Sequence, residues 1–101
     1  MKPATLSPAA DRDLSDAVRW IAKDNPAAAR ALRSGVAKAA TTIGDFRYAG
    51  SIRPEIVDAP YRCFALRGFP CVILYDAERS PPRIMRILHG ARDLPEVLRD
   101  L

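Results

Sequence analysis

The chain has 101 residues, of which 49% are hydrophobic and 28% are charged, so wholesale disorder is excluded and one domain over residues 1–101 is expected. A formal net charge of +4 favours an acidic partner surface, either nucleic acid or protein, without choosing between them. No apolar run is long enough to span a membrane, and the N-terminus lacks the apolar core of a signal peptide. We therefore expect a cytoplasmic protein without membrane contact.

The first half of the sequence predicts a short strand and two helices. Residues 3–6 predict an edge-type strand, and Ser7-Pro8 has the N-cap pattern of a helix over residues 8–24. Asn25-Pro26 ends this helix and starts a second one that runs to residue 42. Each helix has one apolar stripe rich in small residues, which predicts close packing as a helical hairpin. The stripes comprise Ala10, Leu14, Ala17, Val18 and Ile21 on the first helix and Ala29, Leu32, Val36, Ala39 and Ile43 on the second.

Three side chains lie off these stripes and are candidate contacts for a partner. Trp20 lies on the flank of the first stripe, and we favour its packing on the second helix over a role in a partner groove. Arg30 and Arg33 lie on other faces of the second helix. A basic helix face is usually solvated, and the alternative is that these arginines meet acidic residues of a partner.

The second half predicts a long connection and a pair of strands. Gly44 ends the second helix, and the connection to residue 60 is long enough to suggest a function. A short extended piece or one helical turn is expected over residues 51–56. Residues 61–66 and 71–76 predict strands paired around a tight turn. That pairing places Cys63 opposite Leu74 and Cys71 opposite Leu66, on different rungs, so no disulfide is expected.

A further strand is predicted over residues 83–89, and residues 94–101 predict a short last helix that Asp93 caps. Together the elements predict an α+β fold. Its N-terminal strand and helical hairpin pack against one face of a mostly antiparallel four-stranded sheet.

Residues 83–93 hold more polar groups on one element than any other stretch. Strict alternation places Ile84, Arg86 and Leu88 on one face and Arg83, Met85, Ile87 and His89 on the other. Arg86 then lies between two apolar neighbours. It either forms a structural ion pair, with Asp76 or Asp93 as the candidate carboxylate, or is held for a partner. His89 alone is more simply explained as a hydrogen-bonded residue at a strand end.

Several strings together, in this order, resemble the ParE toxins of the RelE/ParE toxin–antitoxin superfamily. The most specific is residues 86–93, Arg-Ile-Leu-His-Gly-Ala-Arg-Asp, which is similar to the C-terminal signature of that family. The resemblance covers nearly the whole chain. The other matching strings are Trp20-Ile21 with Asn25-Pro26 in the hairpin, and Tyr61-Arg62, Gly68 and Tyr75-Asp76 in the strands.

The resemblance implies the toxin component of a type II toxin–antitoxin system. Such toxins trap DNA gyrase on cleaved DNA by binding, without catalysing a reaction. A ParD-type antitoxin neutralises them in a hetero-oligomer and supplies the contact with DNA, and no cofactor or metal is implied. We predict that the target-binding residues are Arg83, Arg86, His89, Arg92 and Asp93, and that the antitoxin-binding residues are Trp20, Arg30 and Arg33.

An enzyme on the same fold is the alternative, namely a RelE-type ribosome-dependent mRNA endoribonuclease. RNA cleavage needs a general acid, a general base and cations at the phosphate. His89, the nearby arginines and Tyr75 are the candidates. One histidine without a second proton-transfer partner cannot supply both the general acid and the general base, so no catalytic residue is predicted. A small nucleic-acid-binding protein ranks last, because the chain has no recognition-helix motif.

Overall fold

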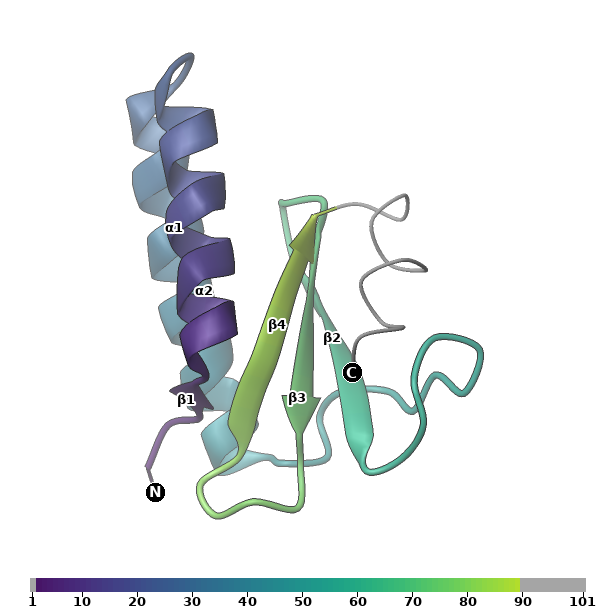
Figure 1. The fold of residues 1–101 in the computed structure, drawn as a ribbon. Helices are drawn as coiled ribbons and strands as arrows, with labels where there is room; N and C mark the ends of the chain where they lie inside the picture. Colours follow the sequence, from purple (N-terminus) through teal and green to yellow (C-terminus); the bar gives the residue numbers. More distant parts are fainter. Residues whose placement is uncertain (1, 90–101) are drawn as a thin grey trace.

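The computed structural model describes residues 2–89, which form two helices and a four-stranded sheet (Figure 1). The sheet order is β1-β4-β3-β2, with β1 parallel to β4 and the other pairs antiparallel. The predicted α+β architecture is therefore confirmed, while the predicted last helix over residues 94–101 lies outside the described residues. The elements are β1 (Thr5–Leu6), α1 (Pro8–Ala22), α2 (Pro26–Asp45), β2 (Tyr61–Leu66), β3 (Cys71–Asp76) and β4 (Arg83–His89).

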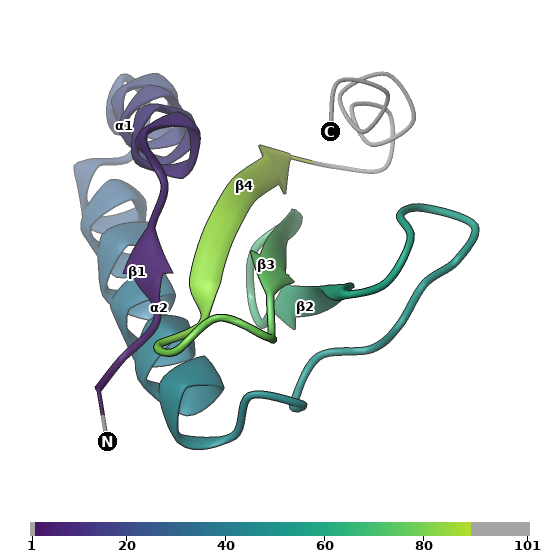
Figure 2. The same ribbon diagram turned by 60° about the horizontal axis from the view of Figure 1, so that its bottom comes forward.

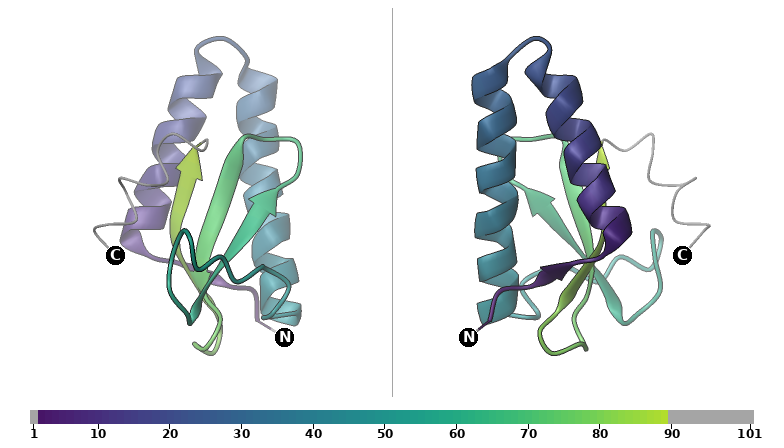
Figure 3. Two further views of the ribbon diagram at one scale, coloured as in Figure 1. Left: turned by 90° about the vertical axis from the view of Figure 1, so that its right-hand side faces the viewer. Right: turned by 60° about the vertical axis from the view of Figure 1, so that its left-hand side comes forward.

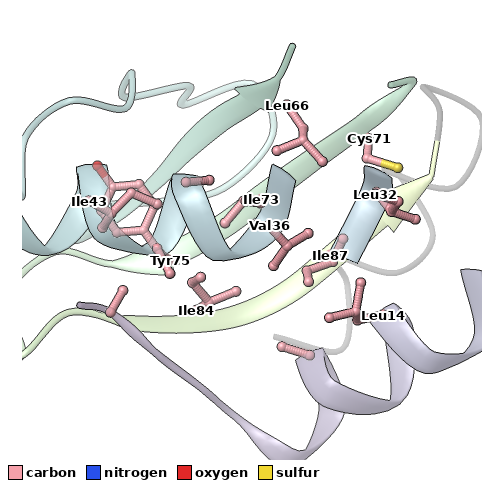
Figure 4. Close-up of a cluster of buried hydrophobic side chains, with 14 of the residues drawn as sticks. Leu14, Leu32, Val36, Ile43, Leu66, Cys71, Ile73, Tyr75, Ile84 and Ile87 are labelled. Atoms are coloured by element: carbon pink, nitrogen blue, oxygen red, sulfur yellow. The ribbon is translucent and has the colours of Figure 1, made fainter. Parts of the chain in front are cut away.

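Both helices lie on the same side of the sheet, as the apolar stripes predicted (Figures 1 and 2). The core between them is made of branched and small side chains from α1, α2, β3 and β4 (Figure 4). The whole predicted stripe of α2 is buried, whereas Ala10 and Leu14 are the buried members on α1. Large members of the core include Leu14, Leu32, Val36, Ile43, Ile73, Tyr75, Ile84 and Ile87.

The helix starts follow the predicted capping residues. The Ser7 hydroxyl accepts a hydrogen bond from the Ala10 N–H at 3.1 Å, and the Asn25 side chain accepts one from the Ala28 N–H at 3.0 Å. The predicted end of α2 at Gly44 is wrong, because the helix continues to Asp45. Gly44 is buried where the N-terminal segment crosses the helix, and an added Cβ would overlap the backbone of that segment. Its small size therefore serves close packing.

The pairing of β2 with β3 follows the predicted register. Cys63 lies opposite Leu74, and Leu66 lies opposite Cys71. Both cysteines are buried and free, as their different rungs require.

β4 contains a bulge that the alternation pattern did not anticipate. Between the rungs at Leu74 and Tyr75 of β3, β4 has one extra residue, Met85. Ile84 and Ile87 consequently both point toward the helices and join the core. The predicted alternation, which placed Ile84 together with Arg86 and Leu88, is therefore wrong, because a bulge shifts the direction of every later side chain by one position.

The connection over residues 46–60 leads from the end of α2 to the start of β2 and loops out on the side of the sheet away from the helices (Figure 3). Ser51 exchanges two backbone hydrogen bonds with Cys63, each 2.9 Å long, and so adds a short extended piece to that edge. A turn follows, in which the Arg53 carbonyl accepts hydrogen bonds from the N–H groups of Ile56 and Val57. The predicted extended piece and a single turn are thus both present.

Candidate functional site

The residues at the start of α1 bond to the first part of the β4 edge that faces away from β3. β1 pairs only with Arg83 and Ile84, and the chain then turns into α1. At this turn the Ser7 N–H donates to the Ile84 carbonyl at 2.8 Å, and the Ser7 hydroxyl donates to the Met85 carbonyl at 2.7 Å. One serine therefore caps the helix and also satisfies the carbonyl that the bulge turns away from β3.

Asp13, about two helical turns later, satisfies the next part of the same edge. Its carboxylate accepts hydrogen bonds from Nε and Nη2 of Arg86 at 2.7 and 3.0 Å, and from the Ile87 backbone N–H at 3.0 Å. The side chains of Arg86 and Asp13 are 24% and 18% exposed. A forked, partly desolvated pair of this kind fixes geometry as well as contributing stability.

The ion-pair interpretation of Arg86 is confirmed, with Asp13 as its carboxylate partner within the described residues. The predicted candidate Asp76 instead lies 3.5 Å from Arg79, and Asp93 lies outside the described residues. Asp13 lies 73 positions away from Arg86 in the sequence, so no local pattern around β4 indicates this pair. The sequence offers a weak signal, namely that Asp13 stands next to Leu14 of the apolar stripe, but neighbouring helix positions point in different directions and leave its partner open.

Trp20 and His89 meet at the other end of α1 and β4. Their ring centroids are 6.2 Å apart at an interplanar angle of 66°, which is an edge-on arrangement. Trp20 is nevertheless 66% exposed, so the prediction that it packs on α2 is wrong. Its described ring contact is with His89 of β4, and most of the indole faces solvent.

The remaining predicted site residues are spread over the molecule. Arg30 and Arg33 are exposed on α2, and neither has a hydrogen bond or ion pair within residues 2–89. Arg83 lies opposite Asp76 at the start of β4, and the length of the strand, about 20 Å, separates it from His89. Arg92 and Asp93 lie outside the described residues.

Tyr75, a candidate for acid–base chemistry, is a buried anchor. Its hydroxyl accepts a hydrogen bond from the Gly50 N–H at 2.8 Å and donates one to the Arg47 carbonyl at 2.8 Å. Burial raises the pKa of the Tyr75 phenol above its ordinary value. Burial also raises the pKa of the Cys63 and Cys71 thiols, which keeps them protonated and unreactive. Over residues 2–89, no group of three or more His, Cys, Asp or Glu residues is placed to hold a metal ion.

A second exposed patch, on the connection after α2, was not singled out from the sequence. Phe46, Tyr48 and Ile52 are exposed there. The Arg62 guanidinium lies 4.8 Å from the centroid of the Tyr48 ring and also donates to the Gly50 carbonyl at 2.8 Å. Phe46 and Tyr48, two aromatic residues close together at the start of the connection, were the available signal.

The family model described as the ParE toxin of the type II toxin–antitoxin system parDE matches residues 4–94, which includes both helices and all four strands. The chain belongs to the ParE toxin family. A solved structure titled "Chromosomal ParDE TA system from P. aeruginosa" has a chain similar to this ParE-family protein, with a TM-score of 0.72 at 17% sequence identity. The alignment covers 89% of this chain and 97% of that chain. No curated protein matches the sequence.

The family match covers the structural features described above. The α1–β4 contact, the Trp20–His89 pair and the exposed arginines of α2 all lie within the matched residues. No helix in the described part of the chain has both the length and the apolar composition needed to cross a bilayer.

Proposed function

We propose that this ParE-family toxin acts in the cytoplasm by binding DNA gyrase, and that a ParD-type antitoxin neutralises it in a hetero-oligomer. The observation that carries the proposal is the family match over residues 4–94. The solved neighbour from a ParDE system supports an antitoxin as partner. In such a complex the antitoxin makes the contact with DNA, and the toxin reaches DNA only through it.

The surroundings of the candidate proton-transfer groups favour binding over catalysis. An endoribonuclease needs an acid and a base that both reach the scissile phosphate. The Tyr75 hydroxyl is buried and engaged in two hydrogen bonds to backbone groups. Within the described residues, the aromatic contact of His89 is the Trp20 indole, which does not exchange protons at neutral pH.

We assign two surfaces within this function. Arg83 and His89, together with Arg92 and Asp93, are proposed to contact the target. Arg86 contributes through its ion pair with Asp13, which holds β4 in position, so its substitution is expected to disturb the fold as well as the surface. The proposed antitoxin-binding residues are Trp20, Arg30 and Arg33.

A paired assay with the purified protein tests the mechanism. One arm measures DNA supercoiling by gyrase and accumulation of the cleaved complex, and the other measures mRNA cleavage on programmed ribosomes. We expect inhibition of gyrase and intact mRNA. Cleavage of mRNA with unaffected gyrase would instead establish the endoribonuclease.

The His89→Gln variant sharpens this test. Glutamine keeps a polar side chain but does not titrate, so an enzyme that uses His89 as acid or base should lose about 100-fold or more in activity. A gyrase-binding toxin should lose much less. The unfolding midpoint of the variant must match that of the unchanged protein, so that a loss of fold is not taken for a loss of chemistry.

The antitoxin surface is tested with charge-removing variants of α2. Because Arg30 and Arg33 are exposed and unpaired within the described residues, they are available to acidic antitoxin side chains. The double variant Arg30→Ala/Arg33→Ala should weaken binding of a cognate ParD-type antitoxin by about 10-fold or more. Lys38→Ala, which removes an exposed charge from the same helix, is the matched control and should have little effect. Equal losses from both would remove the assignment.

A further inference from the structure

The 46–60 connection exposes large apolar side chains close together in the chain. Phe46 is 68% exposed, Tyr48 55% and Ile52 49%. Phe46 and Tyr48 lie in one turn, which is closed by a hydrogen bond of 2.9 Å from the Ala49 N–H to the Phe46 carbonyl. Single exposed apolar side chains are common on protein surfaces, but a group of them on one short segment is typical of an interaction site.

Arg62 of β2 joins this group from the neighbouring strand. Ser51 pairs with Cys63 in an antiparallel bridge. The residues beside this bridge, Ile52 and Arg62, are therefore neighbours. The Arg62 guanidinium also lies 4.8 Å from the centroid of the Tyr48 ring and covers one face of it. We call these four residues the connection patch: Phe46, Tyr48, Ile52 and Arg62.

The backbone that carries the connection patch is fixed by the core. The Tyr75 hydroxyl bonds to the Gly50 N–H and to the Arg47 carbonyl, each at 2.8 Å. Gly50 fits closely at this point, because an added Cβ would lie 2.7 Å from the Tyr75 ring. The Arg47 guanidinium donates to the Ala77 carbonyl and to the Ser80 hydroxyl, each at 3.1 Å. A surface that is ordered before binding loses little conformational entropy when a partner arrives.

Two half-buried arginines hold the connection without a carboxylate partner within residues 2–89. The guanidinium groups of Arg47 and Arg62 donate to neutral oxygen atoms, whereas that of Arg79 pairs with Asp76. A guanidinium has five N–H donors in a fixed fork, so donors remain on Arg62 beside its bond to the Gly50 carbonyl. A carboxylate is the group that fits such a fork best.

The composition of the connection patch favours a protein over a nucleic acid. Aromatic side chains and arginine are enriched at the centre of protein interfaces. Single-stranded nucleic acid instead stacks its bases on open aromatic rings along a basic channel. Here Arg62 already covers one face of Tyr48, and Ile52 offers no ring for stacking. The Glu78 carboxylate, 3.4 Å from the Tyr48 hydroxyl, would also repel a phosphate.

Arg83, one of the proposed target contacts, lies at the same end of the sheet as the connection patch. Arg83 shares a rung with Asp76, and Arg62 pairs with Tyr75 on the adjacent rung. Figure 1 shows the connection and the turn between β3 and β4 together at this end. The proposed antitoxin-binding residues lie toward the other end of the helical hairpin, near the end of α1 and in the first half of α2. The connection patch is therefore placed to extend the surface proposed for the target.

We propose that the connection patch is a contact surface for the target protein. It takes an apolar side chain of the target against its own apolar members, with a neighbouring target carboxylate on Arg62. The inference rests on the proposed function, which identifies the target as gyrase. The net charge of +4 on the chain favours an acidic partner surface of this kind.

Inhibition of gyrase tests the apolar part of the proposal. The double variant Phe46→Ala/Tyr48→Ala should raise the toxin concentration that half-inhibits DNA supercoiling by about 10-fold or more, because it removes two aromatic anchors. Lys38→Ala, at an exposed position of α2 outside the patch, is the control and should leave this concentration unchanged. Both variants should bind a cognate ParD-type antitoxin as tightly as the unchanged protein does, which shows that the fold is kept.

The charge of Arg62 is tested separately. Arg62→Gln retains an amide donor for the Gly50 carbonyl but removes the positive charge, so it should weaken inhibition of gyrase by about 10-fold. Arg62→Lys retains the charge and should lose less. Equal losses of inhibition from the two variants, at matched unfolding midpoints, would refute the contact between Arg62 and a target carboxylate.

The outcomes separate this inference from the proposed function. If the unchanged protein inhibits gyrase and the double variant inhibits it equally well, the target surface on the connection is refuted and the proposed function stands. If the double variant loses antitoxin binding, the patch belongs to the antitoxin contact or to the fold, and the inference is overturned.

Two further results would also overturn the inference. A fluorescent single-stranded oligonucleotide that binds the unchanged protein but not the double variant would assign the patch to nucleic acid. If the unchanged protein does not inhibit gyrase at all, the proposed function falls and the inference falls with it.

Discussion

The α1–β4 contact and the 46–60 connection are both held by hydrogen bonds outside the regular sheet, but by different chemistry. At the α1–β4 contact, the Asp13 carboxylate binds a guanidinium and a backbone N–H, and the pair is partly exposed. At the connection, the neutral Tyr75 hydroxyl joins two backbone groups from a fully buried position.

The two regions also differ in how much of the backbone their contacts hold. The connection is held at several points, since Arg47 and Arg62 add hydrogen bonds to those of Tyr75. The α1–β4 contact fixes the edge of β4 from Ile84 to Ile87 through Ser7 and Asp13. The Asp13 carboxylate fixes the position of β4 relative to α1. The buried Tyr75 hydroxyl fixes the path of the 46–60 connection.

Asp13→Ala should give the largest loss of stability. It removes the carboxylate acceptor from Arg86 and from the Ile87 N–H together, and we expect a loss of about 3 kcal/mol. Chemical denaturation measures the change. Asp16→Ala breaks the exposed pair with Arg19, whose side chains are 74% and 76% exposed, and should change stability by less than about 0.5 kcal/mol. Similar losses from both variants would mean that the α1–β4 pair is no stronger than a surface pair.

Tyr75→Phe should give the next largest effect. The ring and its packing remain, but the Gly50 N–H and the Arg47 carbonyl lose their partner, at a cost of about 2 kcal/mol. Amides of the connection should exchange faster while those of α1 do not. Tyr48→Phe removes a hydroxyl from an exposed tyrosine and is the matched control. Unchanged exchange over residues 46–52 would show that Tyr75 does not hold the connection.

Alkaline pH should lower the stability of the fold through the buried Tyr75, Cys63 and Cys71 side chains. Burial raises the pKa of Tyr75, Cys63 and Cys71, so between the ordinary and the raised pKa the folded protein binds more protons than the unfolded chain. The contribution of each group to the free energy of unfolding is therefore fully present below its ordinary pKa, about 8.5 for the thiols and 10 for the phenol. It is lost as the pH rises toward the raised pKa. Each group contributes a slope of up to about 1.4 kcal/mol per pH unit. Denaturation of Tyr75→Phe across this range should show a shallower decline, and an identical decline would exclude Tyr75 from it.

Arg62→Lys should give the smallest effect of the series. Lysine keeps the charge but loses the planar contact with Tyr48 and the fixed donor to the Gly50 carbonyl, so we expect about 0.5–1 kcal/mol. The loss should shrink in a Tyr48→Ala background, which a double-mutant cycle measures. A full loss in that background would place the whole contribution in the hydrogen bond.

The features that could be predicted from the sequence are those that depend on residues close together in the chain. Ser7 and Asn25 act on N–H groups three positions later, and the β2–β3 register follows from a short turn, so the patterns indicated all of them correctly. The partner of Arg86 and the bulge at Met85 depend on how α1 lies against β4, which no local pattern records. Trp20 was misplaced because its contact with His89 likewise depends on how α1 lies against β4.

The bulge at Met85 and the carboxylate of Asp13 also bear on how the free toxin avoids sticking to itself. Two identical sheets join most readily along a long, unbroken edge. Here Ser7 and Asp13 occupy successive groups of that edge, and the extra residue breaks its regular spacing. A second copy would find few consecutive free groups between Ile84 and Ile87, so this contact limits edge-to-edge association of two toxin molecules along that part of β4.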